Sequence, residues 1–409
     1  AQVSTGSIDS VDGTPADNDF TVTIGNASVT EAGNTDAATT AANLVTALND
    51  STHSYFSTIT WSNPSGGSIT GTADTAGVPF EATLSVSGAG TGSVTDFSDD
   101  TASSGPNDWS AAENWSTGSV PAAADDVVIA GSSDNIVYGL DQNSITLASL
   151  SIQQTYTGKI GLVFNQFSTS ADGETTNSSF TEYRESYLKI GYDTCDIGEN
   201  FGTGSPTGSR RLKVDNQKSG ASTTTIHNTA SSSSEAGSTA VRLLQNNANH
   251  DIDIRRAPAG VGIANAEPGE TSTVGDISIT SSESTTKVFC GSGVTLTNWS
   301  QRGGSNLLEA ASAITKATVN GGALTTEGDY TITTLEVNGG TVDLNHEKDA
   351  GDAVTTLNME GGTVNLTRSS IDRTIGTMNP NAGTLIADKD AITITTLNQP
   401  AGLYTMQVS

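Results

Sequence analysis

The sequence EVNGGTV at residues 336–342 recurs as NMEGGTV at 358–364 near the C-terminal end of the chain. The same pattern stands as TVNGGAL at 318–324, NPNAGTL at 379–385 and NQPAGL at 398–403. The small residues repeat at intervals of 18 to 22, and several units are preceded by a lead-in such as ITTL at 332–335. Self-similarity at about 20 residues is typical of architectures built from stacked units.

This repeat predicts the coils of a parallel β-helix, in which short strands joined by turns stack on one another. One coil cannot bury its own apolar face, so inward side chains form ladders across coils. The Gly-Gly pairs suit sharp corners, where a larger residue would clash or need positive φ. An antiparallel sandwich is the competing interpretation, but it gives no reason for the recurring glycine register. The side chains expected to be buried are Val319, Leu335, Val337, Leu357, Val364 and Leu385.

Between residues 106 and 300, short apolar alternations continue, as in DDVVI at 125–129 and IVY at 136–138. Turn residues separate them, which is typical of strands in a β-rich domain. We interpret 165–181 and 231–234 as long loops, because both are polar and poor in apolar residues. Region 106–300 is therefore the predicted first part of the β-helix, and 301–409 holds its C-terminal coils with the Gly-Gly repeats.

Residues 1–105 have a different organisation, a small α+β module. Strands are predicted at 20–24, 58–61, 68–72 and 82–86 from their apolar alternation. The one convincing helix runs from Asp36 to about Asn49, after cap-forming residues at 34–36. Its apolar face would carry Ala38, Ala41, Leu44, Val45 and Leu48. The predicted fold class is mainly β: a parallel β-helix (β-solenoid) preceded by this module.

The charge balance excludes several partners. The 17 basic and 45 acidic residues give a net charge of −28, so we expect no nucleic-acid partner and no anionic membrane partner. No apolar run approaches the roughly 20 residues of a membrane helix. Ala1 leads directly into polar sequence that does not resemble a signal peptide, and both initiator-methionine removal and signal cleavage fit it. Cys195 and Cys290 leave open a disulfide or two separate buried thiols.

Two stretches carry a resemblance to bacteriophage proteins. The module at 20–86, with ITGTADTAG at 69–77, resembles small modules inserted in phage tail-sheath and other virion proteins. The chain from 107 onward resembles a β-helical family of phage virion proteins. This likeness is carried by motifs at 114–121, 138–142, 157–162, 182–184 and 187–191. It implies a structural role on a phage particle and supplies no catalytic residues.

A catalytic site would need grouped carboxylates or a base beside a bound cation. The best candidate is HDIDIRR at 250–256, where a strand would place Asp251 and Asp253 on one outer face beside Arg255. A strand with a polar outside explains the same residues. Asp125 and Asp126 would point to opposite faces and cannot act together.

No metal site is predicted either. The histidines His53, His227, His250 and His346 show no ligand-type spacing. An alternation of oxygen-bearing residues resembles part of a calcium loop but lacks its turning glycine, so a solvated loop is expected. Its members are Asp343, Asn345, Glu347 and Asp349. Three tryptophans are candidate sugar platforms, although buried anchors suit the first two better: Trp109, Trp115 and Trp299.

We therefore expect a non-enzymatic virion protein at the particle surface, a capsid decoration or head-fibre protein without catalytic residues, cofactor or metal. The alternatives are a tail fibre or adhesin that binds host glycans, and a secreted polysaccharide-degrading enzyme. The expected partners are other virion proteins, foremost the major capsid protein, and further copies of the chain. The uncharged apolar end at 402–409 predicts a covered last coil, hence a homo-oligomer, a trimer by analogy with other fibrous virion β-helices.

Overall fold

The computed structural model describes residues 1–162, 186–199, 208–234, 238–265, 269–346, 351–367, 373–387, 392–398 and 407–408. The chain divides into two compact units. The first comprises residues 1–120, 135–140 and 162–186, and the second comprises 121–134, 141–161 and 187–409. Among the described helices, none is both long and apolar enough to cross a membrane.

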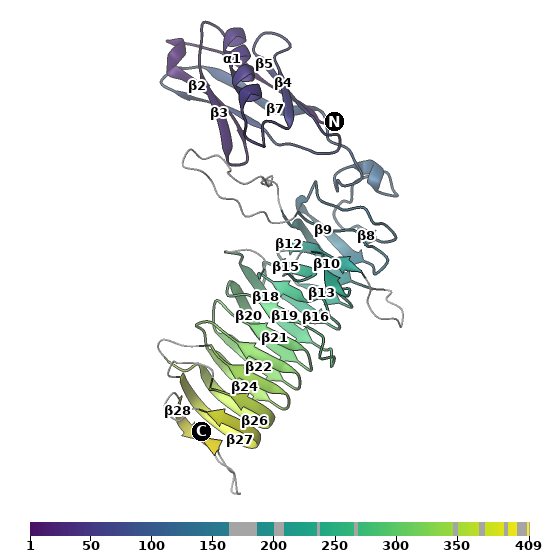
Figure 1. The fold of residues 1–409 in the computed structure, drawn as a ribbon, viewed down its shortest axis with the longest axis vertical. Helices are drawn as coiled ribbons and strands as arrows, with labels where there is room; N and C mark the ends of the chain where they lie inside the picture. Colours follow the sequence, from purple (N-terminus) through teal and green to yellow (C-terminus); the bar gives the residue numbers. More distant parts are fainter. Residues whose placement is uncertain are drawn as a thin grey trace. The chain divides into compact units, whose positions relative to one another are not determined.

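The first unit contains a module of two antiparallel sheets and one α-helix (Figure 1). One sheet has the order β4 (Ile59–Ser62), β5 (Ser68–Ala73), β1 (Val3–Ser10), β7 (Ser93–Thr101). The other has the order β3 (Ala27–Ala32), β2 (Asn18–Ile24), β6 (Thr83–Gly88). The predicted α+β composition of this region is confirmed.

Helix α1 (Ala37–Asp50) begins where Asp36 caps it, since the Asp36 carboxylate accepts a hydrogen bond from the Thr39 amide at 2.7 Å. Its buried face packs against β3, β1 and β4. Leu44 and Leu48 lie wholly inside this core. One predicted face residue is wrong: Ala38 is exposed, because the helix turns Thr40 toward the core in its place.

The second unit is a stacked series of parallel strands, a β-solenoid of about 10 turns (Figure 1). Its first sheet contains one strand from each successive rung: β8 (Asp126–Ile129), β9 (Asp141–Ile152), β10 (Leu188–Ile197), β13 (Ser222–Ile226), β16 (His250–Ile254), β18 (Ser272–Ile279), β20 (Val294–Gln301), β22 (Ile314–Val319), β24 (Ile332–Val337), β26 (Val354–Asn365), β27 (Arg373–Ala387) and β28 (Ile392–Leu397).

The second sheet of the solenoid uses the other strand of each turn. Its members are β12 (Leu212–Asn216), β15 (Val241–Gln245), β17 (Val261–Ile263), β19 (Val288–Cys290), β21 (Ser305–Leu308), β23 (Ala323–Thr326), β25 (Thr341–Leu344), the later halves of β26 and β27, and β29 (Gln407–Val408). All of these pairings are parallel, so the predicted β-helix is confirmed over the antiparallel sandwich.

The register stacks equivalent side chains into inward columns. In the first sheet Ala317 pairs with Leu335, Leu335 with Leu357, and Leu357 with Met378. All six side chains predicted to be buried are buried, with at most 9 % exposure at Leu385. Burial of such ladders is the main stabilising contribution, because no single coil encloses its own apolar face.

The glycine corners are also confirmed. Gly322 and Gly340 both have φ of +75°, and Gly362 has φ of +70°. A Cβ at Gly340 would lie 2.4 Å from the Gly322 carbonyl oxygen, and one at Gly362 would lie 2.7 Å from that of Gly340. Consecutive corners therefore rest directly on one another, and only glycine fits that stacking.

The solenoid interior contains polar groups that the repeat does not predict. Asn216 donates to Gln245 at 2.9 Å, and Gln245 donates to the Tyr192 hydroxyl at 3.2 Å. Tyr192 and Thr224 share a further hydrogen bond at 2.9 Å. All four side chains are buried. Their mutual hydrogen bonds offset the cost of removing these groups from water.

Two local expectations are wrong, and strand β1 was not predicted. Residues 136–138 form no strand, and Tyr138 makes only an isolated bridge with Asp108. Ser232–Ser233, expected in a loop, forms β14, which pairs with β11 (Ser209–Arg210) through backbone and through a 2.8 Å contact between the Ser209 and Ser232 hydroxyls. Strand β1 was missed because its buried face carries Ser4 and Gly6 before Ile8, which gives no apolar alternation.

Several expectations fall outside the described residues. They concern the loop at 165–181, the motif at 182–184, Glu347 and Asp349, and the chain end at 399–406.

Candidate functional site

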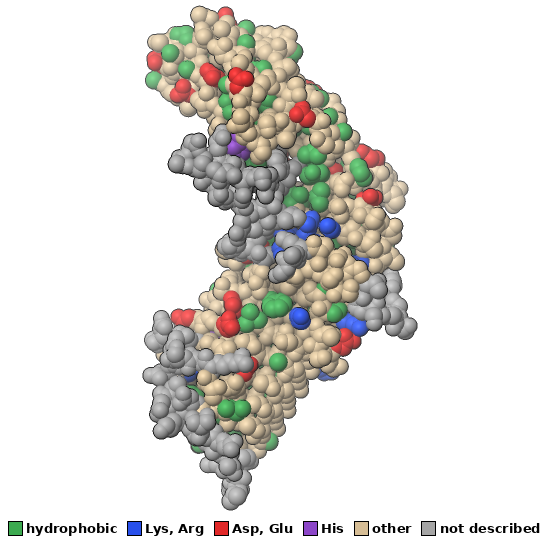
Figure 2. All heavy atoms as spheres, viewed as in Figure 1, with side chains coloured by type: hydrophobic (Ala, Val, Ile, Leu, Met, Phe, Trp, Pro, Cys, Tyr) green, Lys and Arg blue, Asp and Glu red, His purple; other side chains and the backbone are tan. Residues whose placement is uncertain are grey.

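The outward side chains of the first solenoid sheet also stack in register. We name one such row the outer column: Val128, Ser151, Asp196, Thr225, Asp253, Ser278, Ser300, Thr318, Glu336, Asn358 and Asn379. Most of its members are uncharged and polar. The visible face of the solenoid has the same character, with few charged or hydrophobic side chains (Figure 2).

Asp251 and Asp253 lie in β16 as predicted, both on the outer face, while Ile252 and Ile254 point into the core. The two carboxylates do not converge on one site, because each binds a different partner. Asp251 accepts a hydrogen bond from the Asp276 amide at 3.0 Å. Asp253 forms an ion pair with Arg255 at 3.0 Å.

Asp253 accepts a second hydrogen bond from the Thr280 hydroxyl, also at 3.0 Å. The Asp253 carboxylate is therefore occupied by Arg255, two residues along the chain, and by Thr280 on the next rung. The Thr280 contact fixes neighbouring rungs to each other.

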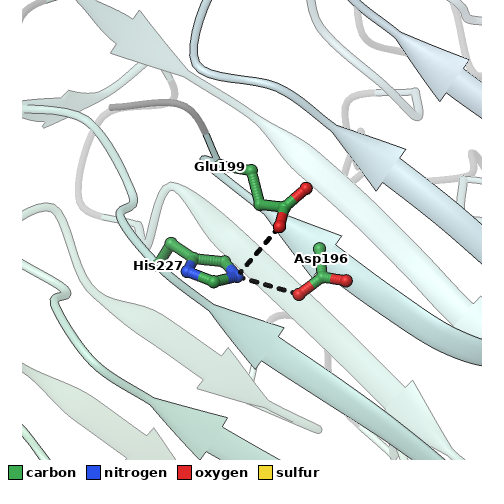
Figure 3. Close-up of side chains that lie close together, drawn as sticks. All are labelled: Asp196, Glu199 and His227. Atoms are coloured by element: carbon green, nitrogen blue, oxygen red, sulfur yellow. Dashed lines mark hydrogen bonds and ion pairs between the residues drawn. The ribbon is translucent and has the colours of Figure 1, made fainter. Parts of the chain in front are cut away.

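A different group converges one rung away, where Asp196, Glu199 and His227 face one another (Figure 3). The His227 Nε2 atom is 2.8 Å from Asp196 Oδ1 and 3.8 Å from Glu199 Oε1. The candidate ligand atoms of the three side chains all lie within 4.8 Å of one another. Each side chain is partly exposed, between 22 % and 37 %.

Rigid backbone holds these three residues. Asp196 is in β10, which ends at Ile197; Gly198 follows with a φ of +78° and turns the chain before Glu199. The Gly198 amide donates to Ile152 at 2.7 Å, and the His227 amide donates to Ile197 at 2.8 Å. Because backbone hydrogen bonds between rungs position both Gly198 and His227, the stacking of the rungs fixes where Asp196, Glu199 and His227 lie.

The Glu199 side chain is oriented from the rung on the other side. The Ser151 hydroxyl donates to Glu199 Oε2 at 3.2 Å, which leaves Oε1 directed toward His227. The Gln154 amide donates to the Glu199 carbonyl at 2.9 Å. Both carboxylates are thereby held close to one imidazole nitrogen.

Arg255 sets the tautomer of His227. Its Nη1 atom lies 3.3 Å from His227 Nδ1, and a guanidinium can only donate. His227 Nδ1 is therefore the acceptor, so the ring proton is on Nε2 and is donated to Asp196. Arg255, His227 and Asp196 thus form a polar chain across three successive rungs, β16, β13 and β10.

The donor set has a definite chemistry. One imidazole nitrogen and two carboxylate oxygens are ligands that suit Zn²⁺ and similar divalent first-row metals. Because all three side chains are partly exposed, water molecules could occupy the remaining coordination positions of a bound metal. The sequence offered no sign of this grouping, because Asp196 and His227 are 31 residues apart. They become neighbours because β10 pairs with β13 so that Ile197 lies beside Ile226, and the irregular sequence of these coils does not show that register.

The other histidines have separate positions. His250 and His346 are buried in the solenoid. Burial lowers the pKa of His250, which interacts with the Gly220 carbonyl at 2.9 Å. His53 lies in the first unit, where its Nδ1 accepts from the Tyr55 amide at 3.3 Å.

The remaining carboxylate candidates that the structure describes each bind a separate partner and form no common site. Asp125 accepts from the Ala122 amide at 2.8 Å, whereas Asp126 accepts from the Ser149 hydroxyl at 2.5 Å. Of the proposed calcium-like loop, Asp343 accepts from Asn365 at 2.9 Å.

Trp109 and Trp299 are each 1 % exposed, so neither presents a ring face on which a sugar could stack. Trp299 lies inside the solenoid, where its indole donates to Gln301 at 3.1 Å. Trp115 packs edge-on against Trp109 with ring centroids 4.7 Å apart. Cys195 and Cys290 are both buried free thiols.

Comparison of the chain with protein families, with curated proteins and with solved structures finds no match.

Proposed function

We propose that this chain is a non-enzymatic structural protein of a bacteriophage particle, a decoration or head-fibre protein at the capsid surface. The observation that carries a structural role is the continuous parallel pairing of strands from β8 to β28. Rungs about 4.8 Å apart, each hydrogen-bonded to the next, form a stiff column. The assignment to a phage rests on the motif resemblance.

The outer surface supports a mechanical role over a catalytic one. The two carboxylates best placed for acid–base chemistry, Asp251 and Asp253, both accept hydrogen bonds from the next rung. Asp253 is also neutralised by Arg255. These contacts use the carboxylates to join rungs. In the proposed role the partners are the major capsid protein and further copies of this chain.

The experiment is to locate the chain on purified phage particles by cryo-electron microscopy with an antibody fragment against it. Density on the capsid surface is the expected result. Density on the tail would favour the adhesin, and absence from particles would overturn the proposal.

A second measurement concerns the chemistry. Asp251→Asn with Asp253→Asn should leave particle assembly and host adsorption unchanged. A tenfold drop in adsorption, or reducing-sugar release from host polysaccharide that this double change abolishes, would contradict a purely structural role.

A further inference from the structure

We propose that Asp196, Glu199 and His227 bind one divalent first-row metal ion such as Zn²⁺, in competition with Arg255. The site is independent of the role on a particle. Its ligand atoms are Asp196 Oδ1, Glu199 Oε1 and His227 Nε2, which already lie within 4.8 Å of one another. Ligands at about 2.0–2.2 Å from zinc lie some 3–4 Å apart, so small side-chain rotations suffice.

Two features distinguish this group from an ordinary surface cluster of acids. The first is preorganisation, because the ligands sit on adjacent hydrogen-bonded rungs. The second is an outer contact of the kind that orients metal ligands, the Ser151 hydroxyl on the far oxygen of Glu199 at 3.2 Å. An imidazole among the ligands also selects for transition metals and zinc over calcium and magnesium.

The competition follows from proton positions. With Arg255 donating to His227 Nδ1, the Nε2 atom carries the proton and offers no lone pair to a metal. When the metal takes Nε2, a neutral imidazole carries its proton on Nδ1, which then faces the N–H groups of Arg255. Two donors cannot share that contact, so Arg255 must move away.

Arg255 is free to make this movement. Its side chain is 54 % exposed, and its Nε atom already holds Asp253 at 3.0 Å. We infer that metal binding releases the Arg255–His227 contact, moves the His227 proton from Nε2 to Nδ1 and leaves the Arg255–Asp253 pair. The Nδ1–H group of His227 then faces water.

The test is calorimetric titration of the full chain with Zn²⁺. We expect saturable binding of one ion, weakened at least tenfold by His227→Asn and by Asp196→Asn. The net charge of −28 attracts any cation, so Asp193→Asn is the matched control. Asp193 is on the same strand and 59 % exposed, but pairs with Lys218 instead. Equal weakening by Asp193→Asn and Asp196→Asn, or unchanged binding in His227→Asn, would overturn the site.

Arg255→Gln tests the competition. Removing the guanidinium should tighten Zn²⁺ binding severalfold, and unchanged or weaker binding would refute the antagonism. Ring ¹⁵N spectra of the wild-type protein give a readout that needs no variant. One histidine should change from the Nε2–H to the Nδ1–H tautomer on addition of Zn²⁺. An unchanged tautomer for all four histidines would contradict binding at His227.

Discussion

Acid should weaken the solenoid through one buried histidine, His346. Its ring is wholly buried and stacks on Tyr330, with centroids 4.6 Å apart and planes at 13°. Nδ1 lies 2.8 Å from the Thr326 hydroxyl, and Nε2 lies 3.0 Å from the Ala353 carbonyl. Both contacts are satisfied by a neutral ring, with Nε2–H as donor and Nδ1 as acceptor.

Burial, aided by the nearby positive charge of Arg373, lowers the pKa of His346 from 6.5 to about 4, against the raising effect of the Ala353 carbonyl. Between these values the unfolded chain binds a proton that the folded chain does not. The contribution of the neutral ring is therefore complete above about pH 6.5 and is lost as the pH falls toward 4. At about 1.4 kcal/mol per pKa unit, the loss is roughly 3 kcal/mol.

The assay compares urea unfolding of the wild type and of His346→Gln between pH 7 and 4. Other groups also titrate in this range, but they titrate in both proteins. The free-energy difference between the two should thus change by roughly 3 kcal/mol in favour of the variant as the pH falls. A difference that stays constant from pH 7 to 4.5, or a His346 proton resonance that titrates near 6.5, would refute this reasoning.

Three further outcomes are expected. Gly340→Ala should lower the free energy of unfolding in urea by about 2 kcal/mol, because its Cβ would lie 2.4 Å from a carbonyl oxygen of the adjacent corner. In the control Gly220→Ala, the nearest atom to the new Cβ is 3.5 Å away, and the same free energy should change by less than about 0.5 kcal/mol. Equal effects would contradict the corner argument. Leu335→Ala, at a wholly buried position, should cost ~2–5 kcal/mol in the same assay, and a smaller loss would mean the coils are loosely packed. Burial raises the pKa of the Cys195 and Cys290 thiols, so both should resist Ellman's reagent in the folded protein and react in denaturant. Reaction of either thiol in the native state would show that its coil opens.

The C-terminal coils could be predicted because their inward positions are almost all aliphatic and their corners are glycine. Leu335 and Leu357 occupy the same position in successive coils and are both wholly buried, so the sequence repeats as well. In the earlier coils the equivalent inward positions include Thr224 and Gln301. These residues are compatible with burial only through hydrogen bonds to particular partners, and that dependence removes the visible repeat.

The candidate metal site could not be predicted for a related reason. Its residues are adjacent only after the register of β10 and β13 is known, and a shift of one residue would reverse the faces of a strand. Asp251 and Asp253 share one strand, so their common face was visible from alternation alone. What alternation could not show is which partner each carboxylate would find on the next rung.

The stacked Gly-Gly corners have a consequence for the length of the column. Val319 pairs with Val337, and Asn338 Nδ2 donates to Asn320 Oδ1 at 2.9 Å, so the start of one coil lies over the start of the next. Removing residues 320–337 would join two equivalent points and leave every later pairing with an equivalent neighbour. The length of the solenoid can therefore change by whole coils, in steps of about 4.8 Å. A gene that duplicates or loses one such unit changes the reach of the protein without redesigning its interior.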